Sequence, residues 1–457
     1  MSEQSATEAR YRKMTETPCK KLILQMAIPS IVSMLVTSIY NLADTFFVGK
    51  LGTSATGAVG IVFTIMAVFQ ALGYGFGVGA SNWISRKMGE QEFDVAAKTL
   101  MTGVFAAVVT GAIFAAFGLL FLEPFMRLIG ATDTILPYAM DYARVILIGG
   151  PFIIASFVFN CTLRGEGSTF LAMGGIVMGA VLNIGLDPLF IFTFHWGVTG
   201  AAAATVLGQI LSFALLLSFY LRGKSSLRLK LSNISPHWAT FKPILWLGMP
   251  SFFRQMLYSV SSVALNIMAK PFGDATIAAM SIVMRVSNFI YQSSMGFGQG
   301  FQPVCGFNFG AKKYGRVRES IQFTMCVLLG ITIVLSALVY FWAGPMIALF
   351  REGDADVIRI GADALRFQCI AMPFNAILLT VNMSYQVMVG GPKALVIAML
   401  RQGVTFMPMI LILPHAIGLA GVQLAQPLAD VAAGLICVVL LSHMMKNLKK
   451  AEESVES

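Results

Sequence analysis

Apolar stretches of about 20 residues or more follow one another along the chain, separated by short polar loops. A helix needs about 20 apolar residues to cross a bilayer, whereas barrel strands show ten-residue blocks of alternating character. The pattern therefore predicts an all-α integral membrane protein with twelve transmembrane helices. Their ranges are 22–48, 55–83, 99–122, 139–161, 169–193, 200–221, 243–269, 275–304, 319–343, 357–386, 392–413 and 416–444.

The apolar pattern contains an internal repeat. A shift of 221 residues superposes Pro29-Ser30 on Pro250-Ser251, and Gly75-Phe76-Gly77 on Gly296-Phe297-Gly298. Each copy holds six predicted helices, an even number, so both copies enter the membrane from the same side. This predicts a parallel 6+6 repeat of two six-helix lobes, an arrangement typical of transporters.

The polar stretch Arg222–Phe241 separates the two copies and is the most polar internal segment. It predicts a domain organisation of five parts. These are an N-terminal tail (1–21), an N-lobe (22–221), a linker (222–242), a C-lobe (243–445) and a C-terminal tail (446–457).

Composition agrees with a lipid environment, since 57% of residues are hydrophobic and only 12% are charged. A soluble chain carries about 25% charged residues. The net charge of +10 does not indicate nucleic acid, because most Lys and Arg residues fall in loops on the same side as the N-terminus. By the positive-inside rule both termini are cytoplasmic, as are the linker and both tails.

The chain shows no spacing of cysteine or histidine residues that is typical of a metal site, and no cluster typical of catalysis. We therefore expect neither an enzyme nor a cofactor. A membrane enzyme or receptor without transport would also leave the internal repeat unexplained.

Charged residues within membrane helices are costly and are usually functional. Asp44 lies in the first predicted helix, and Tyr40 and Asn41 precede it by four and three residues. All three therefore share one helix face. This pattern favours a carboxyl group that binds a proton or a cation. The alternative is a carboxylate that only links neighbouring helices.

A second polar pair lies in the fifth predicted helix, where Asn183 and Asp187 are four residues apart. Pro188 cannot donate to the carbonyl of Ile184, which leaves a backbone oxygen free. Oxygen ligands of this kind suit a proton or Na⁺, and Thr205 of the sixth helix is a further candidate ligand. The alternative is a proline kink with a satisfied polar neighbour.

Neither acid has a counterpart in the second copy, where the shift of 221 places Leu265 opposite Asp44. We therefore expect ion coupling in the N-lobe. Pro29 lies on the same helix as Asp44, and together with Pro188 it is a candidate for helix bending. The paired Gly-Phe-Gly-x-Gly segments lie within apolar helices, which favours close helix contact over phosphate binding.

Three further residues are candidates for lining a substrate cavity, namely Asn41, Arg285 and Asp430. The many Met and Phe residues mostly pack or face lipid, and some of them would suit an adaptable cavity.

Four segments, in order along the chain, resemble motifs of the multidrug and toxic compound extrusion (MATE) family, in its bacterial NorM, DinF and MepA-like branch. They are Tyr40-Asn41-x-x-Asp44-Thr45-x-Phe47-Val48-Gly49-x-Leu51-Gly52, Arg164-Gly165-Glu166-Gly167, Asn183-x-x-x-Asp187-Pro188, and Gly197-x-x-Gly200-Ala201-Ala202-x-Ala204-Thr205. The likeness extends over roughly residues 20–445.

The resemblance implies a monomeric multidrug efflux antiporter of the bacterial inner membrane, with a role in antibiotic resistance. Its cargo would be small-molecule drugs, especially cationic amphipathic compounds, exchanged for H⁺ or Na⁺. It implies an N-lobe site for the proton or Na⁺ at Asp44, Asn183, Asp187 and Thr205, beside Tyr40.

One departure concerns the seventh helix, which in some members carries an acid that binds Na⁺. This chain has no Asp or Glu between Pro243 and Lys270, which puts sodium coupling in the C-lobe in doubt. The alternative function is a flippase for a lipid-linked saccharide or phospholipid, for which only Arg254 and Arg285 would supply cationic groups.

Overall fold

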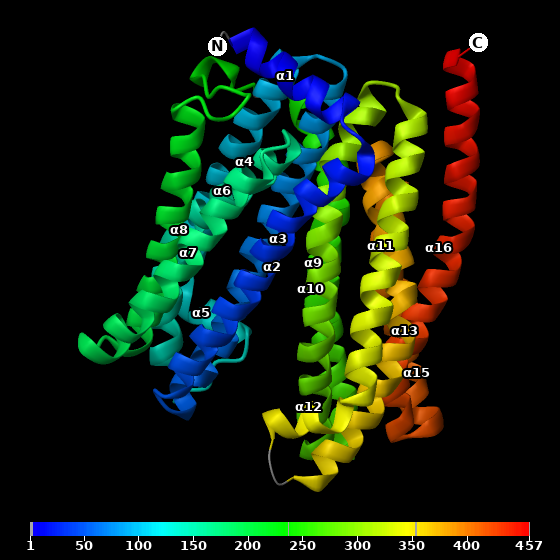
Figure 1. Ribbon diagram of the computed structural model, residues 1–457. Helices are drawn as coiled ribbons and strands as arrows, with labels where there is room; N and C mark the ends of the chain where they lie inside the picture. The colour runs from blue at the N-terminus through cyan, green and yellow to red at the C-terminus, as the bar shows by residue number, and fades with distance from the viewer. Residues whose placement is uncertain (1–2, 236, 352–353, 457) are drawn as a thin grey trace. The chain divides into compact units, whose positions relative to one another are not determined.

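A computed structural model describes residues 3–235, 237–351 and 354–456, and within these ranges every regular element is helical (Figure 1). The α-helices are α1 (Glu3–Glu16), α2 (Cys19–Gly49), α3 (Thr53–Gly89), α4 (Phe93–Leu120), α5 (Leu122–Leu128), α6 (Leu136–Gly165), α7 (Thr169–Pro188), α8 (Gly197–Leu221), α9 (Trp238–Ala269), α10 (Asp274–Gly310), α11 (Tyr314–Phe341), α12 (Ala343–Phe350), α13 (Ala355–Met388), α14 (Gly391–Met399), α15 (Met407–Ile417) and α16 (Leu419–Glu456). Two π-helical segments, η1 (Leu189–Thr193) and η4 (Leu400–Phe406), and two 3₁₀ segments, η2 (Leu231–Asn233) and η3 (Lys270–Phe272), complete the described elements.

Each of the twelve predicted ranges falls on a long helix or on consecutive helical elements that continue one another without a break. Among the described residues, ten helices are long and apolar enough to cross a membrane. The other two ranges fall on α9 and α10, which have 32 and 37 residues and are the repeat counterparts of α2 and α3. The all-helical, twelve-span architecture is therefore present in the chain.

The internal repeat is visible in helix lengths and in the backbone. α3 and α10 both have 37 residues, and α4 and α11 both have 28. Left-handed backbone recurs at matching positions, with φ of 110° at Gly52 and 91° at Gly273, and 63° at Gln91 and 58° at Lys312. Left-handed φ is uncommon outside glycine, so its recurrence at Gln91 and Lys312 shows that the two halves share a loop conformation.

The described chain divides into two compact units whose boundaries lie inside helices. Unit 1 comprises Met1–Thr17 and Val32–Phe252, and unit 2 comprises Pro18–Ile31 and Phe253–Ser457. The first part of α2 therefore packs within unit 2, and the first part of α9 within unit 1. The predicted lobes keep each of these helices whole, so the units differ from them at this point.

Glycines in the two repeated segments account for this division. In unit 1 a Cβ on Gly79 would meet the backbone of Ile244 and Gly248 in α9. In unit 2 a Cβ on Gly300 would meet the backbone of Ala27 in α2. Both glycines let two helix backbones approach closely, which confirms the predicted role of these segments in helix contact.

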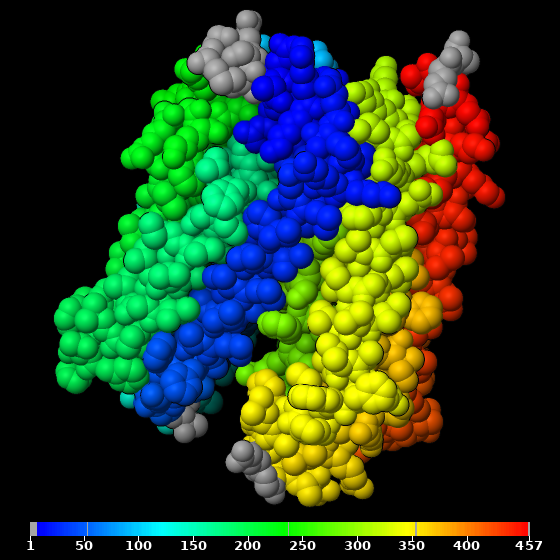
Figure 2. All heavy atoms as spheres, viewed as in Figure 1, coloured from blue at the N-terminus to red at the C-terminus, as the bar shows by residue number. Residues whose placement is uncertain are grey.

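Large apolar side chains are exposed on the outer helices of both units. On α4 of unit 1, Phe117 is 60% exposed and Leu120 is 79% exposed. α11 of unit 2 lies on the face seen in Figure 2 and exposes Ile333, Val334 and Leu338. Apolar surface of this extent is stable in contact with lipid rather than water.

Candidate ion-coupling site

Unit 1 brings together the polar residues of the fifth and sixth predicted helices. The Asn183 side chain of α7 donates to Asp187 Oδ1 at 3.4 Å and to Thr205 Oγ1 of α8 at 3.3 Å. The side chains of all three residues are buried, with 0% exposure for Asp187, 2% for Asn183 and 4% for Thr205. The four-residue spacing on α7 thus places Asn183 and Asp187 on one face, as predicted.

Asp44 lies near the same cluster of polar residues. It lies on the part of α2 that belongs to unit 1, and it is close enough to Asp187 for the two carboxyl groups to interact electrostatically. Tyr40, one turn before Asp44, interacts with both carboxyl groups. Two acids that share an apolar environment cannot both hold an uncompensated negative charge cheaply.

Tyr142 of α6 is a member of the site that the sequence did not reveal. It is 1% exposed, its hydroxyl is within hydrogen-bond reach of Thr205, and it interacts with both acids. No local spacing relates Tyr142 to the other residues, since α6 contacts α8 through tertiary packing.

Three oxygen atoms of the site are buried and have no hydrogen-bond partner among the described residues: Asp44 Oδ1, Asp187 Oδ2 and Asn183 Oδ1. A buried acceptor without a partner costs free energy, and more so when it is charged. A proton on a carboxyl group or a bound cation removes this cost, and oxygen atoms are the ligands that hard cations prefer.

The helix-bending candidates lie in different surroundings. Pro188 is the last residue of α7, and the π-helical segment η1 begins immediately after it. π-Helical turns are rare and often mark functional sites. Pro29 lies within α2 in its first part, which packs in unit 2, whereas Asp44 lies in unit 1. α2 is continuous through Pro29.

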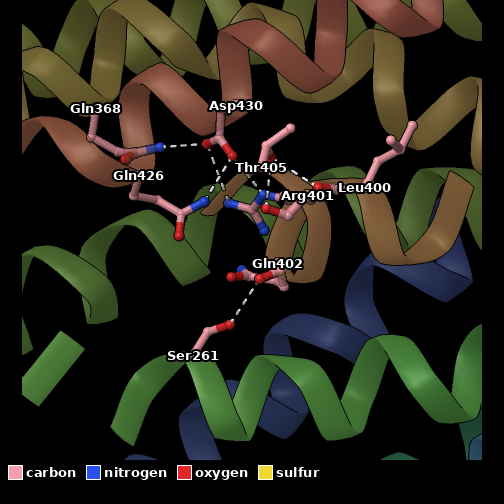
Figure 3. Close-up of polar contacts among 8 residues, drawn as sticks. All are labelled: Ser261, Gln368, Leu400, Arg401, Gln402, Thr405, Gln426 and Asp430. Atoms are coloured by element: carbon pink, nitrogen blue, oxygen red, sulfur yellow. Dashed lines mark hydrogen bonds and ion pairs between the residues drawn. The ribbon is translucent and has the colours of Figure 1, made fainter. Parts of the chain in front are cut away.

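The candidates for a substrate cavity are divided between the two units. Asn41 of α2 and Arg285 of α10 are exposed in unit 1 and unit 2 respectively. Asp430 of α16 is 1% exposed, and its carboxylate forms an ion pair with Arg401 of η4 (Figure 3). Arg254 of α9 donates to Asn382 Oδ1 of α13 at 2.9 Å.

The Arg164-Gly165-Glu166-Gly167 motif spans the C-terminal end of α6 and forms a separate polar cluster there. Glu166 is fully buried, and its Oε2 accepts from Ser225 Oγ at 2.8 Å and from the backbone N–H of Ser226 at 3.1 Å. Burial raises the pKa of the Glu166 carboxyl to about 7, although Arg10 and the Ser225 hydroxyl act in the opposite direction. The carboxyl therefore anchors the loop that follows α8.

Within the described ranges, no three His, Cys, Asp or Glu side chains converge as ligands of a metal ion. The two acids, the amide and the hydroxyl of the candidate site form a set of oxygen donors around α2, α7 and α8.

Comparison with known proteins identifies the class of this chain and then its family. The family model MatE matches residues 29–189 and 250–412, one segment in each half. The chain is therefore a multi-pass membrane transporter, and it belongs to the MatE family. This confirms the resemblance that the sequence motifs indicated.

The curated relatives are export proteins. The multidrug export protein MepA of Staphylococcus saprophyticus is 26% identical over 437 residues, covering 94% of this chain and 96% of the relative. MepA of Staphylococcus haemolyticus is 24% identical over 434 residues, covering 95% of each chain.

Solved structures share the fold over nearly the whole chain. A multidrug resistance MATE family transporter of the MOP superfamily, in an outward-facing conformation, matches with a TM-score of 0.91 and 26% identity, covering 96% of this chain and 98% of that one. A MOP superfamily transporter from Pyrococcus furiosus, described as having a binding pocket of reverse polarity that suggests a different function, matches with a TM-score of 0.90 and 26% identity, covering 96% and 98%. The twelve-helix, two-lobe MATE architecture is thus the fold of this chain.

Proposed function

We propose that this transporter is an antiporter of the bacterial inner membrane, with both termini cytoplasmic. It acts as a monomer in the lipid bilayer and exports organic, mainly cationic amphipathic compounds in exchange for H⁺ or Na⁺. The observation that carries the proposal is the set of buried, unpartnered oxygens on Asp44, Asp187 and Asn183. The relatives named multidrug export protein support the export of drugs.

The coupling ion binds at Asp44, Asn183, Asp187 and Thr205, with Tyr40 and Tyr142 beside them. Protons or Na⁺ ions neutralise the acids and remove the cost of their unpartnered oxygens. Antiport requires that the ion and the drug stabilise different conformations of the protein, because a ligand shifts an equilibrium only through its differential affinity. Ion entry at this site favours the conformation that releases the drug outward, and Pro29 and Pro188 supply the bending points of the helices.

The test is ethidium efflux from proteoliposomes under an inward proton gradient and, separately, under an inward sodium gradient. The wild type is expected to export ethidium under one of the two gradients, which names the coupling ion. Asp44→Asn is expected to abolish the stimulation by the gradient, because an amide binds neither ion as a carboxylate does.

Asp141→Asn is the matched control, since Asp141 is an exposed acid that pairs with Arg144 on α6. This variant should keep gradient-driven efflux. Gradient-driven efflux by Asp44→Asn at the wild-type rate would refute the proposed site. Folded, inserted protein that exports nothing under either gradient would favour the alternative, a flippase for a lipid-linked cargo.

A further inference from the structure

Unit 2 contains a polar cluster in the fourth, fifth and sixth membrane helices of the second half of the chain. The fifth helix of the second half contains the π-helical segment η4, as the fifth helix of the first half contains η1. Arg401 lies in η4, Asp430 and Gln426 lie in α16, and Gln368 lies in α13. The first half thus carries Asp187, with one unpartnered oxygen, just before its π-helical segment, whereas the second half carries Arg401 within its own.

The carboxylate of this cluster is saturated with donors. Asp430 Oδ1 accepts from Arg401 Nε at 2.8 Å and from Gln426 at 2.8 Å. Asp430 Oδ2 accepts from Gln368 at 2.8 Å and from Arg401 Nη2 at 3.3 Å (Figure 3). The side chain of Asp430 is 0% exposed, so this acid has no capacity left for a further ligand.

The guanidinium group of Arg401, in contrast, donates only some of its N–H groups to Asp430. Asp430 engages the side that carries Nε and Nη2, which leaves three of the five N–H donors of Arg401 unused, one on Nη2 and two on Nη1. No residue in the described part of the chain accepts a hydrogen bond from Nη1. The Arg401 side chain keeps 14% exposure while Asp430 has none, so of the two side chains in the ion pair only Arg401 retains accessible surface.

Two tyrosine side chains lie near the guanidinium group. The guanidinium of Arg401 lies over the ring of Tyr291 of α10, 5.1 Å from the ring centroid, a cation–π contact. Tyr258 of α9 is also close enough to interact with the charge of Arg401. Both tyrosines are partly exposed, and Arg254 lies one helix turn before Tyr258. Two cations and one saturated acid give this face of unit 2 a positive potential.

A neighbouring amide also has an unsatisfied atom. Gln402 follows Arg401 in η4, is 5% exposed, and its Oε1 has no partner in the described part of the chain. In the view of Figure 3, Gln402 is drawn on the side of the guanidinium opposite Asp430. Ser261, three residues after Tyr258, donates to the backbone oxygen of Gln402 at 3.4 Å, so α9 and η4 pack together here.

We propose that the free edge of Arg401, together with Tyr258 and Tyr291, is a recognition site for planar aromatic compounds that carry a carboxylate. A guanidinium edge with parallel N–H donors binds a carboxylate through two charge-assisted hydrogen bonds. The tyrosine rings contact the aromatic system of the ligand. Asp430, Gln368 and Gln426 are positioning residues, since they hold Arg401 and do not contact the ligand.

An ion pair alone is a weak explanation for this arrangement. Replacement of a buried pair by apolar residues is often neutral or stabilising, so stability gives little reason for burying Arg401 and Asp430. A purely structural pair also has no need of unused guanidinium donors near two tyrosines. The inference rests on the proposed function only in treating the ligand as cargo.

The test measures binding of 2-naphthoate and of 2-naphthamide to the purified full-length protein by titration calorimetry. The two probes share a ring system and differ in the carboxylate. We expect the wild type to bind 2-naphthoate about tenfold more tightly than 2-naphthamide, the preference that charge-assisted hydrogen bonds provide. Arg401→Lys should remove this preference, because lysine keeps the charge but lacks the fork of parallel donors.

Tyr291→Leu is the second variant, and it should lower the affinity for both probes roughly two- to tenfold. Arg366→Lys is the matched control, since Arg366 is a half-exposed cation of α13 paired with Asp363, and it should bind both probes like the wild type. Equal affinity of the wild type for the two probes, or a preference that survives in Arg401→Lys, would overturn the proposal. Binding needs no ion gradient, so a failure here is distinguishable from a failure of antiport.

Discussion

At the scale of single residues, the candidate site depends on a contrast between two kinds of buried carboxylate. Asp430 accepts hydrogen bonds from four donors, whereas Asp187 has one oxygen without any partner in the described ranges. The first carboxylate is neutralised permanently by Arg401. The second needs a mobile positive charge, which is the property that a coupling site requires.

Sequence spacing predicted part of this site and not the rest. Asn183 and Asp187 lie on one helix, so helical periodicity alone places them together. Tyr142, and the pairing of Arg401 with Asp430, depend on how separate helices pack. Arg401 and Asp430 are 29 residues apart in sequence, and no local rule relates them.

Glu166 gives a prediction for pH dependence. Its pKa in the folded protein is about 7, above the ordinary value of 4.5, because the carboxyl is buried. The folded state therefore holds this proton more tightly than the unfolded state, and stability falls as pH rises from about 4.5 to 7, by roughly 3 kcal/mol. Glu166→Gln, which mimics the protonated form, should lose this slope and should be more stable than the wild type at pH 8.

Thermal unfolding of purified protein at several pH values between 4.5 and 8 checks this prediction. Glu123→Gln is the control, because Glu123 is exposed and pairs with Arg127 at the surface. A stability difference between Glu166→Gln and wild type that does not change over this pH range would contradict the raised pKa.

At the scale of the elements, the helices follow from hydropathy and the packing follows from glycine. An apolar run of about 20 residues in lipid has few solutions other than a helix, so the spans were predictable. The division of the chain inside α2 and α9 was not predictable from hydropathy, because each helix runs without interruption through the boundary between the units. What places the two parts of α9 in different units is contact with other helices.

Substitution of Gly79 tests whether glycine is needed for the close approach of two helix backbones. Gly79→Ala would force its Cβ against the backbone of Ile244 and Gly248, neither of which can move aside as a flexible side chain does. We expect a loss of about 1–3 kcal/mol in stability, typical of overpacking, measured as a lower unfolding temperature in detergent. Gly60→Ala on the same helix has open space around it and should be neutral or stabilising by up to about 1 kcal/mol. Equal effects of the two substitutions would show that close backbone approach at Gly79 is unimportant.

At the scale of the whole molecule, two halves of matching backbone carry different chemistry. The repeat preserves helix lengths and left-handed loop positions, while Asp44 of unit 1 is replaced by Leu265 in the apolar core of unit 2. The coupling site is present in only one half. We therefore expect that neutralising its acids uncouples transport completely. Coupling between two ligands is reciprocal, so a drug that leaves down its own gradient must drive the ion in the opposite direction.

The most direct measurement is therefore ion movement driven by drug. Proteoliposomes are loaded with ethidium, no ion gradient is imposed, and proton uptake and ²²Na⁺ uptake are recorded as ethidium leaves. The wild type is expected to take up one of the two ions in proportion to the ethidium lost, and Asp187→Asn is expected to take up neither. Ethidium loss through the wild type without ion uptake, or unchanged ion uptake in Asp187→Asn, would contradict an antiport mechanism that depends on the acids of unit 1.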